Sequence, residues 1–368
     1  MKRMKAAVLE VQGEALQIRS DLEIQAPGPG QVRVRVSNCG VCHSDLSLVD
    51  GAFPSPLPVI LGHEAAGVVE SVGAGVDSPA PGDHVVLTPC PPCGGCYWCL
   101  RSEQSLCVNS RGIQTSTFSD GSTGLSRAGE RVFRGVNLAA FSEFVVAPAS
   151  GAVPIPREVP LEVACVIGCA VQTGVGAVLN TAGVEEGATV LVAGLGGIGL
   201  SVVQGARVAG ASRILASDPL AERRDAAKGF GATHLLDPTH EDVVKRALEI
   251  CEVGVDYAFE TAGRGGVIET CLAATRLGGT TVCVGAPPLA DALSIAPIAA
   301  FVLSGKHVVG CVLGSSNSLR EIPRLVALWQ AGRLDLEGLI TARRPLSEIN
   351  LALDDLRAGR GIRTVLSI

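Results

Sequence analysis

The sequence of 368 residues lacks several features that would place it in a special class of protein. It has no uninterrupted apolar run of the ~18 residues that a membrane-spanning helix needs. Its most apolar stretch, residues 189–200, is short and interrupted by glycine. It also lacks an excess of positive charge. The net charge of −6 and the pI near 5.6 argue against nucleic acid or an anionic membrane as the main partner.

Other classes are excluded by composition. The 45 glycines have no Gly-X-Y period, so the chain is not collagen-like. The N-terminus, MKRMKAAVLEV, has no apolar signal core or small-residue cleavage site, so we expect a cytoplasmic protein. Hydrophobic residues make up 47% and charged residues 18%, which excludes intrinsic disorder. At roughly 100–200 residues per domain, the length predicts two or three domains.

The predicted elements fall into two regions. Residues 1–150 are typical of a β-rich domain, with alternating or β-branched strands at 31–37, 65–72 and 83–87. After about residue 170, short apolar strands at 189–193, 213–217, 233–236, 257–260 and 280–284 alternate with segments of helix length. The predicted helices span 198–209, 221–230, 241–252, 267–275 and 319–331. The alternation predicts a parallel sheet covered by helices on both faces.

A glycine-rich turn follows the strand at 189–193. Gly194, Gly196 and Gly199 form a G-x-G-x-x-G pattern, with Gly197 and Ile198 between them, at the start of a helix. The glycines permit a tight turn, approach of the backbone to a pyrophosphate, and close packing of helix on strand. Asp218 ends the next strand, where an acid accepts hydrogen bonds from the adenosine ribose. Asp218 would repel a 2′-phosphate, so NAD is favoured over NADP, although the nearby Arg223 partly offsets this. The alternative is a glycine-rich loop without a ligand.

The thirteen cysteines are unevenly distributed, and five fall within residues 90–107. In a long chain without a secretion signal, clustered cysteines favour metal binding or catalysis over disulfides. Four closely spaced thiolates suit a closed, structural zinc site, whose ligands would be Cys93, Cys96, Cys99 and Cys107. An iron–sulfur cluster is the alternative, but the ferredoxin spacings differ. Cys90 is interpreted as a spare thiol.

A second candidate metal site needs distant pieces of the chain. Cys42, His63 and Cys169 would supply two sulfurs and one imidazole, and Glu64 follows His63 directly. Two cysteines and one histidine leave a fourth position open, which is typical of a catalytic zinc. Spacing alone does not bring these residues together. Taken singly, His63 is equally typical of a polar loop and Cys169 of a core.

The chain resembles the zinc-dependent medium-chain alcohol dehydrogenases over essentially its whole length. The matching motifs, in the family's order, are GVCHSD, GHEAAGVVESVG, PGDHVV, the four-cysteine loop, GLGGIG and GIRTVLSI. The resemblance implies a GroES-like catalytic domain over residues 1–170 and a Rossmann domain that binds NAD over 171–313. Residues 314–368 would return to the catalytic domain.

The resemblance also implies roles for individual residues. Catalytic zinc would be held by Cys42, His63 and Cys169, with Glu64 as an occasional alternative ligand and Asp45 orienting His63. Structural zinc would occupy the four-cysteine loop, giving two zinc ions per subunit. Ser44 would accept the proton of the alcohol while its hydride passes to the nicotinamide. Cofactor contacts are implied for the following residues: His43, Thr173, Asp218, Arg223 and Arg363.

Some positions depart from the family pattern. Ser47 stands where many relatives have a histidine that ends the proton relay, so the relay would end through Ser47, water or His43. By resemblance Phe53 and Leu87 line the substrate pocket, which favours a hydrophobic primary alcohol, with aryl and terpenoid alcohols among the candidates. The long segment 108–140 is typical of homodimeric members, and residues 292–312 would lie near the dimer-forming edge.

Two alternative functions stay open at the level of sequence. One is a nicotinoprotein, which keeps NAD bound and passes electrons to a second substrate. The other, from a different class, is a redox sensor that binds NAD and zinc without catalysis.

Overall fold

The computed structural model describes residues 1–295 and 297–368, which form two compact units. Unit 1 comprises residues 1–172, 316–332 and 336–368. Unit 2 comprises residues 173–315 and 333–335. Because both ends of the chain belong to unit 1, strands far apart in sequence can pair within it.

Unit 1 contains two β-sheets in the described part of the chain. The strand order is β8-β7-β2-β1-β4-β9 in one and β11-β6-β5-β3-β19-β18 in the other, where β10 also pairs with β3. The strands of unit 1 are β1 (Lys2–Leu9), β2 (Gln17–Ile24), β3 (Gln31–Gly40), β4 (Val59–Ile60), β5 (Glu64–Val72), β6 (His84–Leu87), β7 (Leu125–Arg127), β8 (Glu130–Arg131), β9 (Phe133–Arg134), β10 (Phe144–Pro148), β11 (Ala152–Ile155), β18 (Ile340–Pro345) and β19 (Arg363–Ser367). The strands predicted at 31–37, 65–72 and 83–87 are therefore present.

The pairing of β3 with β5 positions the second candidate metal site. Their antiparallel register places Gly40, at the end of β3, opposite Glu64, at the start of β5. The C-terminal strand β19 joins the other edge of β3, with Val365 opposite Gly40.

The helices of unit 1 are α1 (His43–Val49), α2 (Tyr97–Leu100), α3 (Gly112–Thr115), α4 (Leu161–Ala164), α11 (Ser318–Gln330) and α12 (Ile349–Arg357). Helix α5 (Ala170–Gly176) begins in unit 1 and continues into unit 2.

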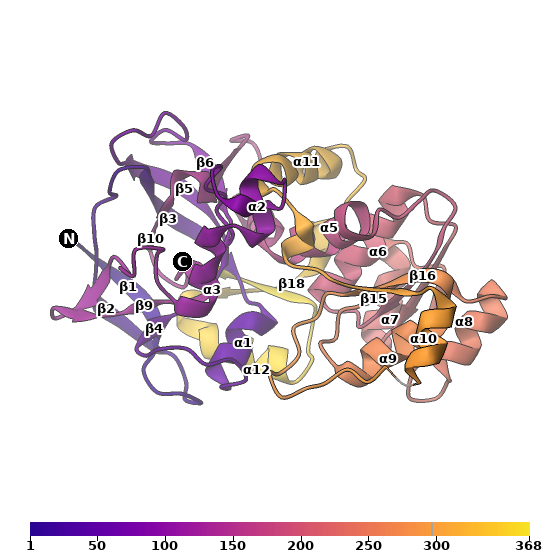
Figure 1. The fold of residues 1–368 in the computed structure, drawn as a ribbon. Helices are drawn as coiled ribbons and strands as arrows, with labels where there is room; N and C mark the ends of the chain where they lie inside the picture. Colours follow the sequence, from indigo (N-terminus) through magenta and orange to yellow (C-terminus); the bar gives the residue numbers. More distant parts are fainter. Residues whose placement is uncertain (296) are drawn as a thin grey trace. The chain divides into compact units, whose positions relative to one another are not determined.

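Unit 2 is built on a parallel sheet with strand order β14-β13-β12-β15-β16-β17 (Figure 1). Leu191 of β12 joins residues of α8 and α9 in one apolar cluster. Val190 and Val192, on the opposite face, are equally buried, and α6 contacts this strand. The elements are β12 (Thr189–Ala193), α6 (Gly197–Ala209), β13 (Arg213–Ser217), α7 (Ala221–Phe230), β14 (His234–Leu236), α8 (Val243–Cys251), β15 (Val255–Glu260), α9 (Gly265–Ala274), β16 (Thr275–Cys283), α10 (Ile298–Ser304) and β17 (His307–Gly310). Helices on both faces confirm the predicted parallel α/β architecture.

Two elements of unit 2 were not predicted from the sequence, the short helix α10 and the edge strand β17.

Among residues 1–295 and 297–368, no single helix is long and apolar enough to cross a membrane. The pair of helical stretches 161–168 and 170–182 passes the length and composition test together, but it is bent by 53°.

Candidate catalytic and metal-binding sites

Four residues predicted for the second metal site come together inside unit 1. Cys42 lies at the N-terminus of α1, His63 and Glu64 at the start of β5, and Cys169 directly before α5. One ligand atom from each residue lies within 4.8 Å of the others. Gly168 allows this arrangement, because a methyl group there would lie 2.6 Å from the carbonyl oxygen of Leu87. The fold therefore assembles a cluster that sequence spacing could not.

Asp45 supports the cluster through contacts with the residues that carry its ligands. Its fully buried carboxylate accepts hydrogen bonds from the amides of Gly62 (2.9 Å) and Cys42 (3.3 Å). The same carboxylate lies 3.1 Å from Nδ1 of His63. This contact uses Nδ1 as the donor to the carboxylate, so Nε2 is the nitrogen left to face a metal ion. Within the described residues, this buried Nε2 has no hydrogen-bond partner.

Electrostatics favour a cation at this cluster. Burial opposes charge on His63, but the negative charges of Asp45 and Cys42 raise its pKa well above the usual range. A hydrogen bond with Cys169 lowers the pKa of Cys42, and the same bond raises that of Cys169. Cys42 therefore loses its proton more readily than Cys169. A bound metal ion would release the protons of this cluster, because it coordinates thiolate and neutral imidazole.

Glu64 and Arg363 form a buried pair beside the ligands. Burial raises the pKa of Glu64 to about 7, although the positive charge of Arg363 opposes this shift. Nη1 of Arg363 lies 3.5 Å from Oε1 of Glu64 and donates a hydrogen bond to the carbonyl of Val41 (2.8 Å). In the part of the chain that the structure describes, neither oxygen of Glu64 has a hydrogen-bond partner. Two thiols, one imidazole nitrogen and this carboxylate fit a tetrahedral zinc ion.

The other residues predicted for catalysis lie on or near α1. The hydroxyl of Ser44 lies 3.9 Å from the sulfur of Cys42, and Ser44 is half-buried. Ser47 is half-buried one turn further along α1, and His43 is exposed. Leu87 is fully buried in the core of unit 1, and Phe53 packs against that core.

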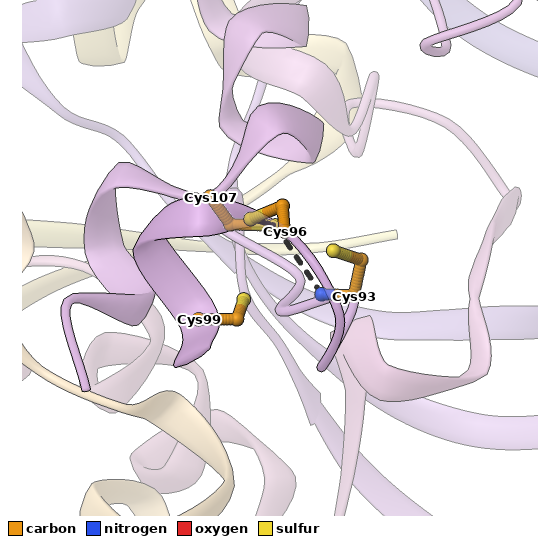
Figure 2. A group of neighbouring side chains, drawn as sticks. All are labelled: Cys93, Cys96, Cys99 and Cys107. Atoms are coloured by element: carbon orange, nitrogen blue, oxygen red, sulfur yellow. Dashed lines mark hydrogen bonds between the residues drawn. The ribbon is translucent and has the colours of Figure 1, made fainter. Parts of the chain in front are cut away.

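The four-cysteine loop forms the other cluster of unit 1 (Figure 2). The sulfurs of Cys93, Cys96, Cys99 and Cys107 lie within 4.8 Å of one another. The amides of Cys93 and Asn109 donate hydrogen bonds to the sulfur of Cys107, at 3.2 and 3.5 Å. Hydrogen bonds from backbone amides lower the pKa of Cys96 to about 6, whereas burial raises that of Cys107 to about 12. Four thiols this close together, with backbone amides donating hydrogen bonds to the sulfurs of Cys96 and Cys107, fit a closed zinc site.

Cys90 is the nearest further thiol in sequence and lies outside this cluster. It is buried, and burial raises its pKa to about 11. A thiol in this state behaves as a small apolar side chain.

The glycine-rich turn joins β12 to α6 in unit 2. Gly194 has a φ of +94°, and Gly196 directly precedes α6, so Gly197, Ile198 and Gly199 form the first helical turn. A methyl group at Gly199 would overlap the carbonyl oxygen of Gly194, whereas one at Gly196 would meet no described atom within 4 Å. Gly199 is thus needed for packing, and the space above Gly196 is open for a ligand.

Asp218 is held against this turn. Its carboxylate accepts hydrogen bonds from the amides of Leu195 (2.8 Å) and Leu220 (2.9 Å). Arg223 forms an ion pair with it at 3.8 Å. Thr173, the first residue of unit 2, is buried on α5.

Some residues that support these sites were not found from the sequence. The hydroxyl of Thr261, at the end of β15, donates a hydrogen bond to the carbonyl of Gly194 (2.6 Å) and so holds the turn. In unit 1, Ser318 of α11 bonds to both Thr88 and Gln172, at 2.9 Å each. This network joins the end of β6 to the helix that follows Cys169. A lone threonine or serine carries no sequence signal for such a contact.

A surface hollow of about 290 Å³ in unit 1 lies elsewhere, lined by Asn38, Glu162, Arg343, Arg344, Pro345, Val365 and Ser367. Ion pairs to acids neutralise both of its arginines. None of the residues predicted for catalysis lines it, so it carries no part of the chemistry.

Comparison with known families is consistent with this geometry. Residues 28–157 match the family model described as alcohol dehydrogenase GroES-like domain, and residues 197–328 match the one described as zinc-binding dehydrogenase.

Solved structures similar to this chain match it over its whole length. An alcohol dehydrogenase zinc-binding domain protein from Burkholderia ambifaria is 36% identical with a TM-score of 0.95, covering 100% of this chain and 99% of that one. Benzyl alcohol dehydrogenase from Acinetobacter calcoaceticus is 32% identical with a TM-score of 0.95, covering all of both chains. A zinc-binding dehydrogenase from Sinorhizobium meliloti 1021, bound to NADP, is 29% identical with a TM-score of 0.83, again covering all of both chains.

Proposed function

Because the chain belongs to the zinc-dependent medium-chain alcohol dehydrogenase family, we propose that it oxidises a hydrophobic primary alcohol reversibly to its aldehyde, with NAD as hydride acceptor. The observation that carries this proposal is the cluster of Cys42, His63 and Cys169, with Asp45 behind His63. A non-catalytic sensor would have no need of this cluster beside Ser44. Zinc would be held at this cluster and at the four-cysteine loop, two ions per chain.

Residues of unit 1 would hold the metal ion and transfer the proton of the alcohol. Cys42, His63 and Cys169 would hold a zinc ion, and the chemistry it would supply is that of a Lewis acid that lowers the pKa of an alcohol hydroxyl. Ser44 accepts the proton of the substrate hydroxyl and passes it outward through Ser47, water or His43. Asp45 keeps His63 in the tautomer whose Nε2 coordinates metal. Glu64 would be the alternative ligand when the substrate position is exchanged.

The residues of unit 2 would bind the cofactor, which accepts the hydride. The open space above Gly196 and the amides at the start of α6 support a pyrophosphate there. The buried carboxylate of Asp218 supports NAD, because it would repel a 2′-phosphate. Arg223 would lie beside the ribose and Thr173 near the nicotinamide. Arg363, whose partners are Glu64 and Val41, is proposed for the pyrophosphate from resemblance alone.

An apolar substrate is supported by two observations. Leu87 and Phe53, the proposed pocket residues, are both carbon side chains that pack with the core of unit 1. The relative from Acinetobacter calcoaceticus is named a benzyl alcohol dehydrogenase. We therefore propose aryl alcohols as the first substrates to test, with terpenoid alcohols next.

The first experiment follows NADH formation by zinc-loaded protein with a series from ethanol to hexanol, benzyl alcohol and geraniol. Turnover that rises with the apolar surface of the alcohol, and that is faster with NAD than with NADP, supports the proposal. Ser44→Ala should lower kcat/KM by about 100-fold or more, as loss of a proton acceptor does. The exposed Ser20→Ala is the matched control and should leave kcat/KM unchanged.

A parallel assay with an artificial electron acceptor and no added NAD separates the alternatives. Turnover in that assay alone would show a nicotinoprotein, in which NAD stays bound. Inactivity in both assays, with zinc and NAD bound, would overturn the proposal in favour of a sensor.

We further propose that the protein is a homodimer formed through the edge of the sheet in unit 2. Strand β17 ends the strand order and has an unpaired edge among the described strands. In the helix that precedes it in sequence, α10, all seven residues are exposed or half-buried, and Leu303 is 87% exposed. An apolar edge of this kind is typical of an interface.

A further inference from the structure

Residues 134–141 contact both candidate metal sites of unit 1. This segment runs from the end of β9 towards β10 and begins within the long region 108–140. It contacts the chain directly before His63 at one end and residues that flank the four-cysteine loop at the other, so it links the surroundings of the two sets of ligands.

At the His63 end, the segment holds the backbone of the preceding two residues. The amides of Ala140 and Phe141 donate hydrogen bonds to the carbonyls of Gly62 and Leu61, both at 2.8 Å. Gly62 has a φ of +90°, and a methyl group there would lie 2.6 Å from the amide nitrogen of Phe141. The direction in which the chain enters His63 therefore depends on where residues 140 and 141 lie.

At the four-cysteine end, the contact runs through the side chain of Asn137. Its amide nitrogen donates hydrogen bonds to the carbonyls of Asn109 (3.0 Å) and Pro89 (2.8 Å). The amide of Asn109 in turn donates to the sulfur of Cys107 at 3.5 Å. One continuous series of contacts thus leads from a cysteine of the loop to the residue before His63.

The segment is held in a conformation that the chain would not adopt freely. Val136, Asn137 and Ala139 have φ values of +48°, +66° and +63°, in the left-handed region. Each such residue costs about 1 kcal/mol or more. Buried Arg134 stabilises the conformation, because it donates hydrogen bonds to the carbonyls of Asn137 (2.9 Å) and Val146 (2.8 Å).

We propose that Asn137 is a positioning residue that couples the two metal sites, so that an ordered four-cysteine loop strengthens metal binding at Cys42, His63 and Cys169. The proposal rests on the proposed function in that both clusters must bind metal. Asn137 acts on His63 only through residues 140 and 141, and it does not touch the substrate.

The test uses Co²⁺, whose visible absorption distinguishes a four-cysteine site from one with two cysteines and a histidine. Asn137→Gly keeps the left-handed backbone but removes both amide hydrogen bonds. We expect Co²⁺ affinity at the Cys42–His63–Cys169 site to fall by about 10-fold, the usual loss when a supporting partner of a ligand is removed. Removing the four-cysteine ion from the wild-type protein should produce a similar loss. In Asn137→Gly the same removal should have little further effect.

Two further variants keep the test decisive. Asn109→Ala is the matched control. It changes an asparagine of the same region but keeps the backbone carbonyl that Asn137 contacts and the backbone amide that Cys107 contacts. Its Co²⁺ affinities should match those of the wild type. Asn137→Asp preserves shape and backbone preference, and it is titrated alongside in case glycine prevents folding. Wild-type affinity in either folded Asn137 variant overturns the coupling. A wild-type protein that binds fewer than two ions per chain overturns the proposed function itself.

Discussion

At the scale of single residues, Gly196 and Gly199 of the turn after β12 have different roles, so substituting them should have different effects. Gly196→Ala adds a methyl group where no described atom lies within 4 Å, so folding should be unaffected. The methyl group would occupy the space proposed for the pyrophosphate, and NAD affinity should fall by about 10-fold or more. Gly199→Ala overlaps the carbonyl of Gly194 and should destabilise unit 2 by about 2 kcal/mol.

The measurements are the NAD dissociation constant by fluorescence titration and the free energy of unfolding in urea. The two variants serve as controls for each other, since both add one carbon to the same turn. Unchanged NAD affinity in a folded Gly196→Ala protein would contradict a pyrophosphate at this turn.

Also at this scale, the glycine turn could be predicted from sequence, but the hydrogen bonds that hold such sites in place could not. Three glycines at fixed offsets after a strand form a local pattern, and the structure has them where α6 begins. Thr261 and Asn137 act through side-chain hydrogen bonds to carbonyls of distant chain segments. Any threonine or asparagine can form such a bond, so the sequence does not distinguish these two residues.

At the scale of elements, Asp256 joins three strands of unit 2. On β15, its carboxylate accepts hydrogen bonds from the amide and hydroxyl of Thr189 on β12, both at 2.8 Å. Arg276 of β16 donates to it at 2.6 Å. Burial raises the pKa of Asp256, but these hydrogen bonds outweigh burial and lower it below the usual value. The carboxylate therefore stabilises the folded state above the unfolded pKa, and this contribution is lost as the pH falls through the folded pKa.

Asp256→Asn should accordingly destabilise the protein by about 1–2 kcal/mol at pH 7, as expected for charge-assisted hydrogen bonds. The difference from wild type should shrink as the pH falls below ~4, the usual pKa of an unfolded aspartate, and through the lower pKa that Asp256 has in the folded state. Urea unfolding at both pH values measures it. Asp225→Asn, an exposed change of the same charge on α7, should show little difference at either pH. A difference for Asp256→Asn that does not depend on pH would contradict the ionic contribution.

The elements also show which parts of the fold follow from local patterns. Strands and helices of unit 2 were predicted because each apolar run has its own period and boundaries. The edge strand β17 and helix α10 were missed, since α10 has no buried face and so no amphipathic pattern. In unit 1, the metal cluster depends on the register of β3 with β5 and on Gly168 packing against Leu87. Such long-range pairing leaves no local pattern, so only the resemblance to a family brought Cys42, His63 and Cys169 together in advance.

At the scale of the whole molecule, the proposed homodimer depends on an apolar edge that would otherwise be exposed to water. Leu303 and Val302 of α10 are 87% and 70% exposed, and this helix directly precedes β17, the last strand in the order of the described sheet. Leu303→Asp would bury a charge in the interface, which costs several kcal/mol unless the charge is paired. We expect this variant to be monomeric at concentrations where the wild type is dimeric, with unchanged secondary structure.

Sedimentation velocity over a range of concentrations measures the change, and circular dichroism checks folding. Leu351→Asp places the same charge on α12 of unit 1, where the leucine is also exposed, and should remain dimeric. If Leu303→Asp sediments as the wild type does, α10 lies outside the interface. The apolar side chains of α10 and the edge of β17 would then need another partner, because exposed apolar surface and unpaired edge strands favour aggregation.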